Sequence, residues 1–436
     1  MAQPQKKAPI KKKNTISDLK AKMGFGVNVE KGEIQNASNA DKPIDWILMP
    51  EAFQDAIKLP GFPQGYVTTI CGHPNTGKST LVNHAIVSAQ RQGIVPVIYD
   101  TENNFDFQYA IDMGMDATPV YGDVNVEVVD PETGDVSIVK ENRIIEYDGP
   151  FVYFNNAILM ERYGDIDYST GKRGGKKRNS AVIEDIVYSI NEFLEAQAEG
   201  DIDQGFLFLW DSVGSIGGLK SYNSKVGNNM FDAGTISAAF QDIMDNKIPS
   251  SRKVSAKYTN TMVMINKIWL DGTTNPVAPP SMEMKGGKSI TYRSRLIILL
   301  GGQLKASVKR LSAVSKGLTY NYGTQTKIKV LKNQLPSPFN VTYEGEFICT
   351  DTGIIGTDKD SQEEYKKRRI PEILKKLHEI AINNGKDIQF NGEDVDFVES
   401  EGDQIEWLYY LCYKVNYNVL YDFWYKLNNN KVLLCR

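Results

Sequence analysis

The sequence predicts an α/β protein with a mainly parallel, twisted sheet, followed by a small, mainly helical C-terminal domain. From about residue 43 to residue 356, short β-rich apolar runs alternate with helical stretches, as expected for parallel strands joined by crossover helices. Several of these runs end on a polar residue, and one leads into a glycine-rich turn. After about residue 356 the composition shifts, which marks the boundary of the second domain, residues 357–436.

Length and composition restrict the class of protein. A chain of 436 residues is consistent with two to three domains of about 150 residues each. Charged residues make up 24% and hydrophobic residues 41%, as in globular proteins with a sizeable core. The longest apolar runs, such as Phe206–Trp210, are far shorter than the roughly 18 residues that cross a bilayer, and no apolar stretch follows the basic start. We therefore expect a soluble cytoplasmic protein that does not engage a membrane.

Cysteine usage and net charge exclude other classes. The four cysteines (Cys71, Cys349, Cys412 and Cys435) are widely spaced, which argues for a reducing compartment and against a disulfide framework or a zinc site. The formal net charge of −4 does not by itself indicate a nucleic-acid binder. The distribution of the charges therefore matters more than their sum.

Both ends of the chain have distinctive compositions. Residues 1–15 are predicted to form a disordered basic tail, either a DNA- or partner-binding arm or a solubilising segment, and residues 16–42 a helix and linker. In the C-terminal domain, Glu393–Glu406 is strongly acidic, either competing with DNA for basic loops or serving as a solvated linker. An aromatic stripe in Trp407–Leu427 could stack on bases, but favours the core of that domain.

The predicted core, residues 43–356, contains an insertion at about residues 121–180. Its Asp130–Asp135 turn between β-branched runs indicates a hairpin, and its basic tract Gly171–Arg178 an exposed loop. A helix is expected to follow the first strand directly. The expected strands of the sheet are Gly65–Gly72, Ile94–Asp100, Phe206–Asp211, Thr261–Asn266 and Arg295–Leu300.

The strongest motif is GHPNTGKS at Gly72–Ser79, a complete GxxxxGK[ST] between a predicted strand and a predicted helix. Its glycines allow the backbone N–H groups to turn toward phosphate oxygens, and the helix N-terminus adds a favourable dipole. Lys78 would reach the β- and γ-phosphates, and Ser79 would bind Mg²⁺. The alternative is a fortuitous glycine-rich turn. The predicted ATP-binding residues are Gly72, His73, Pro74, Asn75, Thr76, Gly77, Lys78, Ser79 and Thr80.

A P-loop enzyme also needs carboxylates at the ends of neighbouring strands. Asp211 follows five apolar residues and is the second candidate Mg²⁺ ligand. The next residue is Ser212 rather than a glutamate, so the group that orients water must come from elsewhere. Glu102, just past the strand Ile94–Asp100, is that candidate if the two strands are adjacent. The alternative for Glu102 is a surface residue that caps the following helix.

Taken together, these motifs resemble the RecA-type recombinases, with the phage UvsX branch favoured. Asp100-Thr101-Glu102 and the residues after it resemble the segment with the catalytic glutamate and adenine contacts, and Leu209–Val213 resembles the Walker B strand. The resemblance implies a RecA-like core in which Glu102 activates water, Asp106 touches the adenine and Tyr109 stacks on it. It further implies a bacterial or phage-infected host cytoplasm.

Later motifs extend the resemblance to about Ile355, with departures. Asn266 matches the polar end of a core strand, but Lys267 follows it where the family commonly has Gln or His. The family's Lys-Asn-Lys triplet, whose lysines reach the γ-phosphate held by a neighbouring protomer, is here Lys332-Asn333-Gln334. The resemblance therefore implies that Lys332 acts on the neighbour's ATP, with Lys267 a candidate to restore the missing charge.

Two loops are candidate DNA contacts. Between Gly272 and Tyr322 there are eight lysines and arginines against one acid, Glu283. The first candidate loop, Leu270–Lys288, is rich in Gly, Pro, Thr and Asn, as expected of a mobile phosphate-binding loop. The other candidate loop, Lys220–Phe231, follows the Walker B strand. The alternative is that both are ordinary surface loops. The predicted DNA-binding residues are Lys220, Tyr222, Lys225, Lys285, Gly286, Gly287 and Lys288.

The predicted function is that of an ATP-dependent DNA recombinase that forms filaments on single-stranded DNA and pairs it with homologous double-stranded DNA. Expected partners are both forms of DNA, further copies of the chain, and single-strand-binding and mediator proteins. Two alternatives stay open. The core could serve a ring helicase or a circadian-clock-type ATPase, or the protein could be a weakly hydrolysing recombination mediator or DNA binder.

Overall fold

The computed structural model describes residues 40–129, 136–223, 234, 238–271, 281–284, 287–315, 318–369, 389–390 and 393–394. The expected basic tail, nearly all of the helix and linker at 16–42, and most of the expected C-terminal domain lie outside these residues. Of that domain, a helix at 359–369 and a short antiparallel pair, β16 (Gln389–Phe390) and β17 (Glu393–Asp394), are described.

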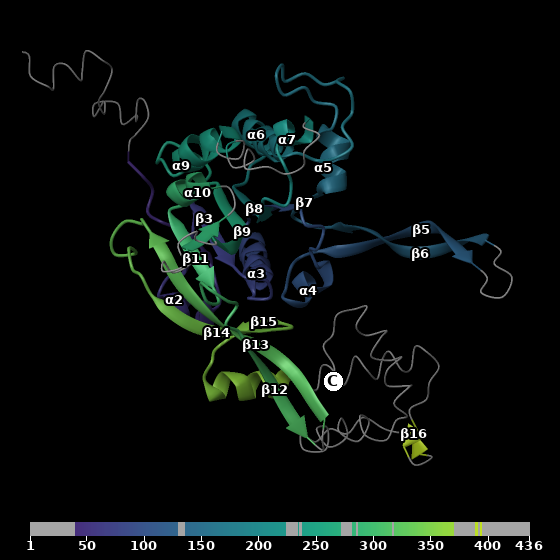
Figure 1. Ribbon diagram of the computed structural model, residues 1–436, viewed down its shortest axis with the longest axis vertical. Helices are drawn as coiled ribbons and strands as arrows, with labels where there is room; N and C mark the ends of the chain where they lie inside the picture. Colours follow the sequence, from purple (N-terminus) through teal and green to yellow (C-terminus); the bar gives the residue numbers. More distant parts are fainter. Residues whose placement is uncertain are drawn as a thin grey trace, which may run out of the picture.

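One large mixed sheet forms the centre of the described chain (Figure 1). Its strands β11, β3, β9, β8, β4 and β7 are parallel, and β13, β14 and β15 extend it in antiparallel fashion. The predicted α/β fold with a mainly parallel core is confirmed. In spatial order the strands are β15 (Gly353–Ile355), β14 (Glu344–Thr350), β13 (Leu318–Asn333), β11 (Leu296–Leu300), β3 (Val67–Gly72), β9 (Thr261–Asp271), β8 (Phe206–Val213), β4 (Val95–Asp100) and β7 (Val152–Asn155), with β10 (Ser281–Met284) on β9 and β12 (Lys309–Ser315) on β13.

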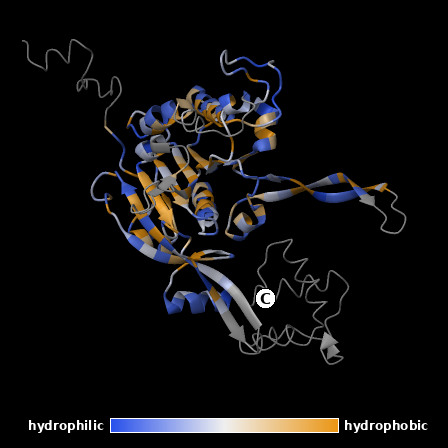
Figure 2. Cartoon of the chain, viewed as in Figure 1, coloured by the Kyte–Doolittle hydropathy of each residue, from blue (hydrophilic) through white to orange (hydrophobic). Residues whose placement is uncertain are grey.

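Each face of the sheet packs against helices, because alternate residues of a buried strand point to opposite sides. On β8, Leu207 and Leu209 join the cluster that contains α2 (Glu51–Ile57), α3 (Lys78–Arg91) and α4 (Phe107–Asp112). Phe208 and Trp210 join the other cluster, with α5 (Asn156–Tyr163), α6 (Ile183–Glu199), η1 (Ile243–Lys247), α9 (Ile248–Ser250) and α10 (Gly287–Arg293). The apolar strands lie between these helices in Figure 2. No helix among the described residues is both long and apolar enough to traverse a bilayer.

The predicted hairpin is present as a separate two-stranded sheet, β5 (Thr118–Val129) and β6 (Val136–Asp148), that projects from the body beside α4 (Figure 1). Its root is fixed by Tyr147, whose ring stacks on Phe107 of α4 with centroids 4.2 Å apart. The turn at Asp130–Asp135 lies outside the described residues. Part of the expected insertion at about 121–180 belongs to the central sheet, because β7 pairs with β4 there.

The basic tract Gly171–Arg178 is exposed as predicted except at its last residue. Arg178 is buried and pairs with the buried Asp185 of α6, while its guanidinium also donates to the carbonyls of Tyr163 and Ile166. Asp185 in turn accepts the backbone N–H of Val182 at the start of the helix. Arg178 is therefore a structural residue, since its hydrogen-bonding capacity is directed inward.

This buried pair generates a stability prediction. Asp185→Ala should lower the free energy of unfolding by about 3–5 kcal/mol, because it leaves the Arg178 charge buried without its carboxylate. Asp203→Ala is the matched control, since the Asp203–Lys257 pair is largely exposed and its loss should cost no more than about 1 kcal/mol. Urea unfolding of both variants measures the difference, and equal losses would show that the buried pair is not a determinant of stability.

Candidate nucleotide-binding site

The glycine-rich motif forms the turn between β3 and α3 at the carboxyl edge of the parallel strands. Gly77 adopts a φ of 89°, and a Cβ there would lie 2.4 Å from Cys349 Sγ. A side chain at this position would be both strained and blocked, so glycine is required. The loop is thereby closed against β14, which carries Cys349.

Lys78 lies inside this loop. Its Nζ donates to the carbonyl of His73 at 2.7 Å, and Thr76 Oγ1 donates to the same carbonyl at 2.8 Å. Burial lowers the pKa of Lys78, while the nearby Asp211 and Glu102 act in the opposite direction. Pro74, Asn75 and Ser79 are exposed, which leaves the mouth of the loop and the Ser79 hydroxyl open to a ligand.

Strand register brings the predicted carboxylates to this same edge. β4 and β8 are neighbours, with Asp100 directly opposite Asp211. The two strands are therefore adjacent, as a role for Glu102 in orienting water requires. Asp100 is buried and fixes the turn after β4, because it accepts the backbone N–H groups of Asn104 and Phe105 and the hydroxyl of Tyr153. That turn carries Glu102.

Glu102 is held by three donors from neighbouring strand ends. Lys267 Nζ of β9 lies 2.7 Å from Glu102 Oε1, Ser215 Oγ donates to the same oxygen at 2.9 Å, and Ser212 Oγ also donates to it. Burial disfavours the ionised form of Glu102, but these hydrogen bonds outweigh it and lower its pKa. Glu102 is therefore an oriented carboxylate that stays ionised near neutral pH, rather than a residue that caps a helix from the surface.

Asp211 is the opposite case. Burial and the neighbouring charges of Glu102 and Asp100 raise its pKa to about 7. A divalent cation between Asp211 and the Ser79 hydroxyl would offset this repulsion, and Mg²⁺ commonly uses one or two protein ligands together with phosphate oxygens. Within the described part of the chain, no group of three or more His, Cys, Asp or Glu could hold a metal by itself. The residues present thus fit a Mg²⁺ shared with a nucleotide.

The two predicted adenine contacts lie on α4. Asp106 caps this helix by accepting the N–H of Tyr109 at 3.2 Å. The Tyr109 hydroxyl donates to the carbonyl of Thr350 and contacts Thr80 Oγ1, both at 2.9 Å. Tyr109 therefore stands beside the first turn of α3, next to the phosphate-binding loop. Their contact with adenine stays a prediction.

Asn266 and Lys267 lie within the adjacent strand β9, opposite Cys71 and Gly72 at the end of β3. Lys332 does not belong to this group. It is near the end of β13, opposite Ile297, and its Nζ donates to the carbonyls of Thr291 and Tyr292 at 2.7 and 2.8 Å. These positions are near the amino edge of the parallel strands, so Lys332 does not contribute to the phosphate loop of its own chain.

The DNA-binding candidates are only partly described. Lys220 is exposed on α7 (Leu219–Asn223), and the Tyr222 hydroxyl donates to Asn179 Oδ1 at 2.9 Å, which ties α7 to the segment after the basic tract. Gly287 begins α10. Lys225, Lys285, Gly286 and the side chain of Lys288 lie outside the described residues. Their role stays a prediction.

Sequence reasoning missed the residues that support Glu102. Ser212 was noted as the residue in place of a glutamate, and the structure places its hydroxyl on Glu102 instead. The one available signal for Ser215 was its position three residues later, just past the strand end. The pairing of Lys267 with Glu102 also was not expected, because it joins strands that are not neighbours.

The fold and the loop geometry define a P-loop protein of the α/β class. In comparison with known proteins, residues 14–147 match the RecA N-terminal domain. The chain is 33% identical to Protein RecA of Chlorobaculum parvum over 290 residues, which are 66% of this chain and 61% of that protein. It is 22% identical to Protein RecA of Francisella tularensis over 426 residues, which are 90% of this chain and 94% of that protein. It is 35% identical to Protein RecA of Mesoplasma florum over 95 residues, which are 20% of this chain and 27% of that protein. These similarities support a RecA-type recombinase family for the chain, and the phage-type branch stays a prediction.

The position of Lys78 leads to a direct test. Lys78→Ala should reduce ATP affinity at least tenfold, because the phosphate charge loses a partly buried counter-ion. Lys58→Ala, an exposed lysine on the C-cap of α2, should leave affinity within about twofold. Titration with a fluorescent ATP analogue in Mg²⁺ measures both, and equal affinities would remove Lys78 from the site.

Proposed function

We propose that the protein is a DNA-dependent ATPase that assembles on single-stranded DNA and promotes pairing and strand exchange with homologous duplex DNA. The observation that carries this proposal is the placement of Glu102 and Asp211 on adjacent strand ends beside Lys78, in a chain similar to the RecA-type family. A phosphate loop supplies binding, and an oriented, ionised carboxylate supplies the means to use water.

In this mechanism the loop N–H groups and Lys78 bind the phosphates. Ser79 and Asp211 would hold Mg²⁺, which would neutralise charge on the transferred group. Glu102 accepts a hydrogen bond from the attacking water and orients it. Lys267 is ion-paired with Glu102 at 2.7 Å, so it must turn away before the carboxylate can act on water. A γ-phosphate offers Lys267 a competing anion, which makes Lys267 the residue that releases Glu102 when ATP is present.

In the structure Lys267 pairs with Glu102 of the same chain. With ATP bound its charge would lie at the γ-phosphate of that chain, and its expected role in replacing the missing cation of the Lys-Asn-Lys triplet stays a prediction. Lys332, near the other edge of the sheet, is suited to act on the nucleotide of a neighbouring protomer, which requires that copies associate head to tail. Single-stranded DNA would contact the loops at 220–231 and 270–288.

The catalytic role of Glu102 gives the next prediction. Glu102→Gln should preserve ATP binding and lower turnover by roughly a hundredfold or more, the usual scale for a lost general base. Glu199→Gln, at the exposed end of α6, is the matched control and should hydrolyse ATP at the wild-type rate. Turnover on single-stranded DNA measures both variants. A Glu102→Gln protein with an unchanged rate would exclude Glu102 from the chemistry.

Assembly is tested by electron microscopy of the full chain with single-stranded DNA, Mg²⁺ and a slowly hydrolysed ATP analogue. Nucleotide-dependent helical filaments are expected, because head-to-tail contacts that do not close generate open assemblies. Closed rings would support the helicase or clock-type alternative. DNA-bound particles with neither form, together with negligible turnover, would support the mediator alternative.

A further inference from the structure

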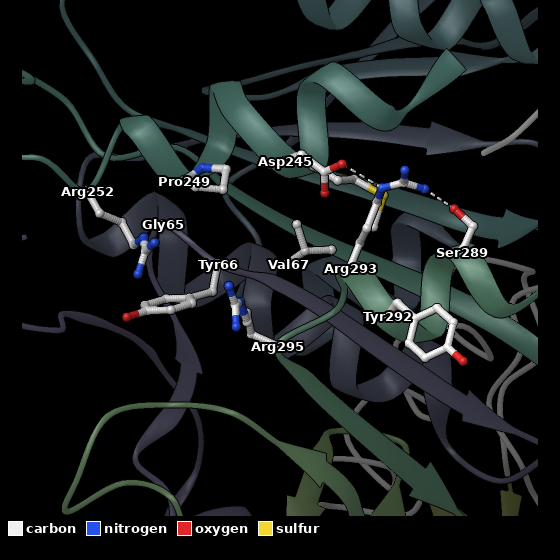
Figure 3. Close-up of a pocket in the computed structure, with 11 residues that line it drawn as sticks. Gly65, Tyr66, Val67, Asp245, Pro249, Arg252, Ser289, Tyr292, Arg293 and Arg295 are labelled. Atoms are coloured by element: carbon white, nitrogen blue, oxygen red, sulfur yellow. Dashed lines mark hydrogen bonds and ion pairs between the residues drawn. The ribbon is translucent and has the colours of Figure 1, made fainter. Parts of the chain in front are cut away.

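A cavity of about 500 Å³ opens at the amino edge of the parallel strands, away from the phosphate loop (Figure 3). Its floor is the start of β3, and its walls come from η1, α9, α10 and the segment before β11. Val67 lines the cavity, and Gly72 begins the phosphate loop at the other end of β3. Five strand steps of about 3.3 Å separate them by about 17 Å, so one nucleotide phosphate group cannot occupy both places.

The lining is rich in guanidinium groups. Among the described residues, Arg252, Arg293 and Arg295 line the cavity with a single carboxylate, Asp245. Asp245 is already paired with Arg293 at 2.9 Å, as Figure 3 shows. Arg252 lies 4.1 Å from the centroid of the Tyr66 ring. Its Nη1 is 3.6 Å from Asp41 Oδ2, while its Nε is buried with no hydrogen-bond partner in the described part of the chain.

Arg295 is the most available of the three. Its side chain is exposed, and its described side-chain hydrogen bond is a long one, 3.4 Å from Nη1 to Gln334 Oε1. The two residues are also joined through the backbone, since Gln334 N donates to Arg295 O at 2.8 Å. Burial and the nearby Arg295 lower the pKa of Lys332, so these two cations lie close enough to repel each other. An anion placed between them would relieve that repulsion.

The planar fork of a guanidinium matches phosphate oxygens, and a cation-rich cavity without a spare carboxylate favours a multiply charged anion. The strand separation excludes the phosphates held by the same chain. We propose that Arg295, beside Gln334 and Lys332, is a phosphate-contacting residue that binds the nucleotide held in the phosphate loop of a second copy of this chain. This rests on the proposed function, and it assigns to Arg295 the charge that Gln334 lacks.

The first experiment measures DNA-stimulated ATP hydrolysis by the full chain. Arg295→Ala should reduce it at least tenfold, because a cation supplied to the transferred phosphoryl group by a neighbour is worth orders of magnitude. Arg295→Gln, which keeps a polar side chain but lacks the charge, should show the same loss. Adding Gln334→Lys to Arg295→Ala should recover the rate to within about threefold of wild type. Arg143→Ala, an exposed arginine on β6, is the matched control.

A second copy as the source of the nucleotide is tested by mixing. Arg295→Ala and Lys78→Ala proteins, each nearly inactive alone, should regain part of the activity together, because some interfaces then pair an intact loop with an intact Arg295. Dilute Arg295→Ala protein without DNA should bind ATP within twofold of wild type. The proposal is overturned by no recovery on mixing, by lost ATP binding in the dilute variant, or by Arg295→Ala activity equal to that of Arg143→Ala.

Failure of the proposed function is recognised separately, as absence of DNA-stimulated hydrolysis in the wild-type protein. The cavity is then probed by calorimetry with inorganic tripolyphosphate added to Lys78→Ala protein, whose own phosphate loop is disabled. Binding that falls at least fivefold when Arg295→Ala is added supports the anion site. Equal heats with and without Arg295 overturn it.

Discussion

The parallel register of β3, β9, β8 and β4 is the constraint on which the site depends. It sets Asp100 opposite Asp211 and Gly72 opposite Lys267, so that a loop, two acids and a cation from segments far apart in sequence converge on one edge. The ion pair between Lys267 and Glu102 spans β8 and therefore exists only while all three strands keep this register. A slip of one residue would turn the alternating side chains of β8 to the wrong faces, with loss of both clusters of the core at once.

The charges at this edge balance only in part. Glu102 is compensated by Lys267 and two serines and is readily ionised, whereas Lys78 and Lys267 only partly offset the like charges of Glu102 and Asp100 beside Asp211. Hydrogen bonds to Glu102 thus outweigh its burial and lower its pKa, whereas the deeper burial of Asp211 and the charges of Glu102 and Asp100 raise the pKa of Asp211. This division suits one acid to act on water and the other to hold a cation.

The sequence predicted what is local and periodic. The strand and helix around Gly72–Ser79 follow from apolar pattern and turn chemistry, and Glu102 and Asp211 could be paired because each follows such a strand. What failed depended on contacts between distant residues. Arg178 sits in a basic tract but is drawn inward by Asp185, and β7 could not be separated from the hairpin before its pairing with β4 was known. The pairing of Lys267 with Glu102 was missed for the same reason, since the order of strands in a sheet depends on contacts between distant segments and cannot be predicted from any one of them.

The phosphate loop and the arginine-lined cavity occupy opposite edges of one sheet, and this has a consequence for how activity scales with size. If each working site takes its loop from one copy and Arg295 from the next, an open row of n copies holds n − 1 complete sites. The copy at one end keeps a nucleotide that no arginine completes, and the copy at the other end keeps an arginine without a nucleotide to contact. The rate of ATP hydrolysis per copy would therefore be low in short assemblies and higher in long ones. The nucleotide at one end would stay unhydrolysed.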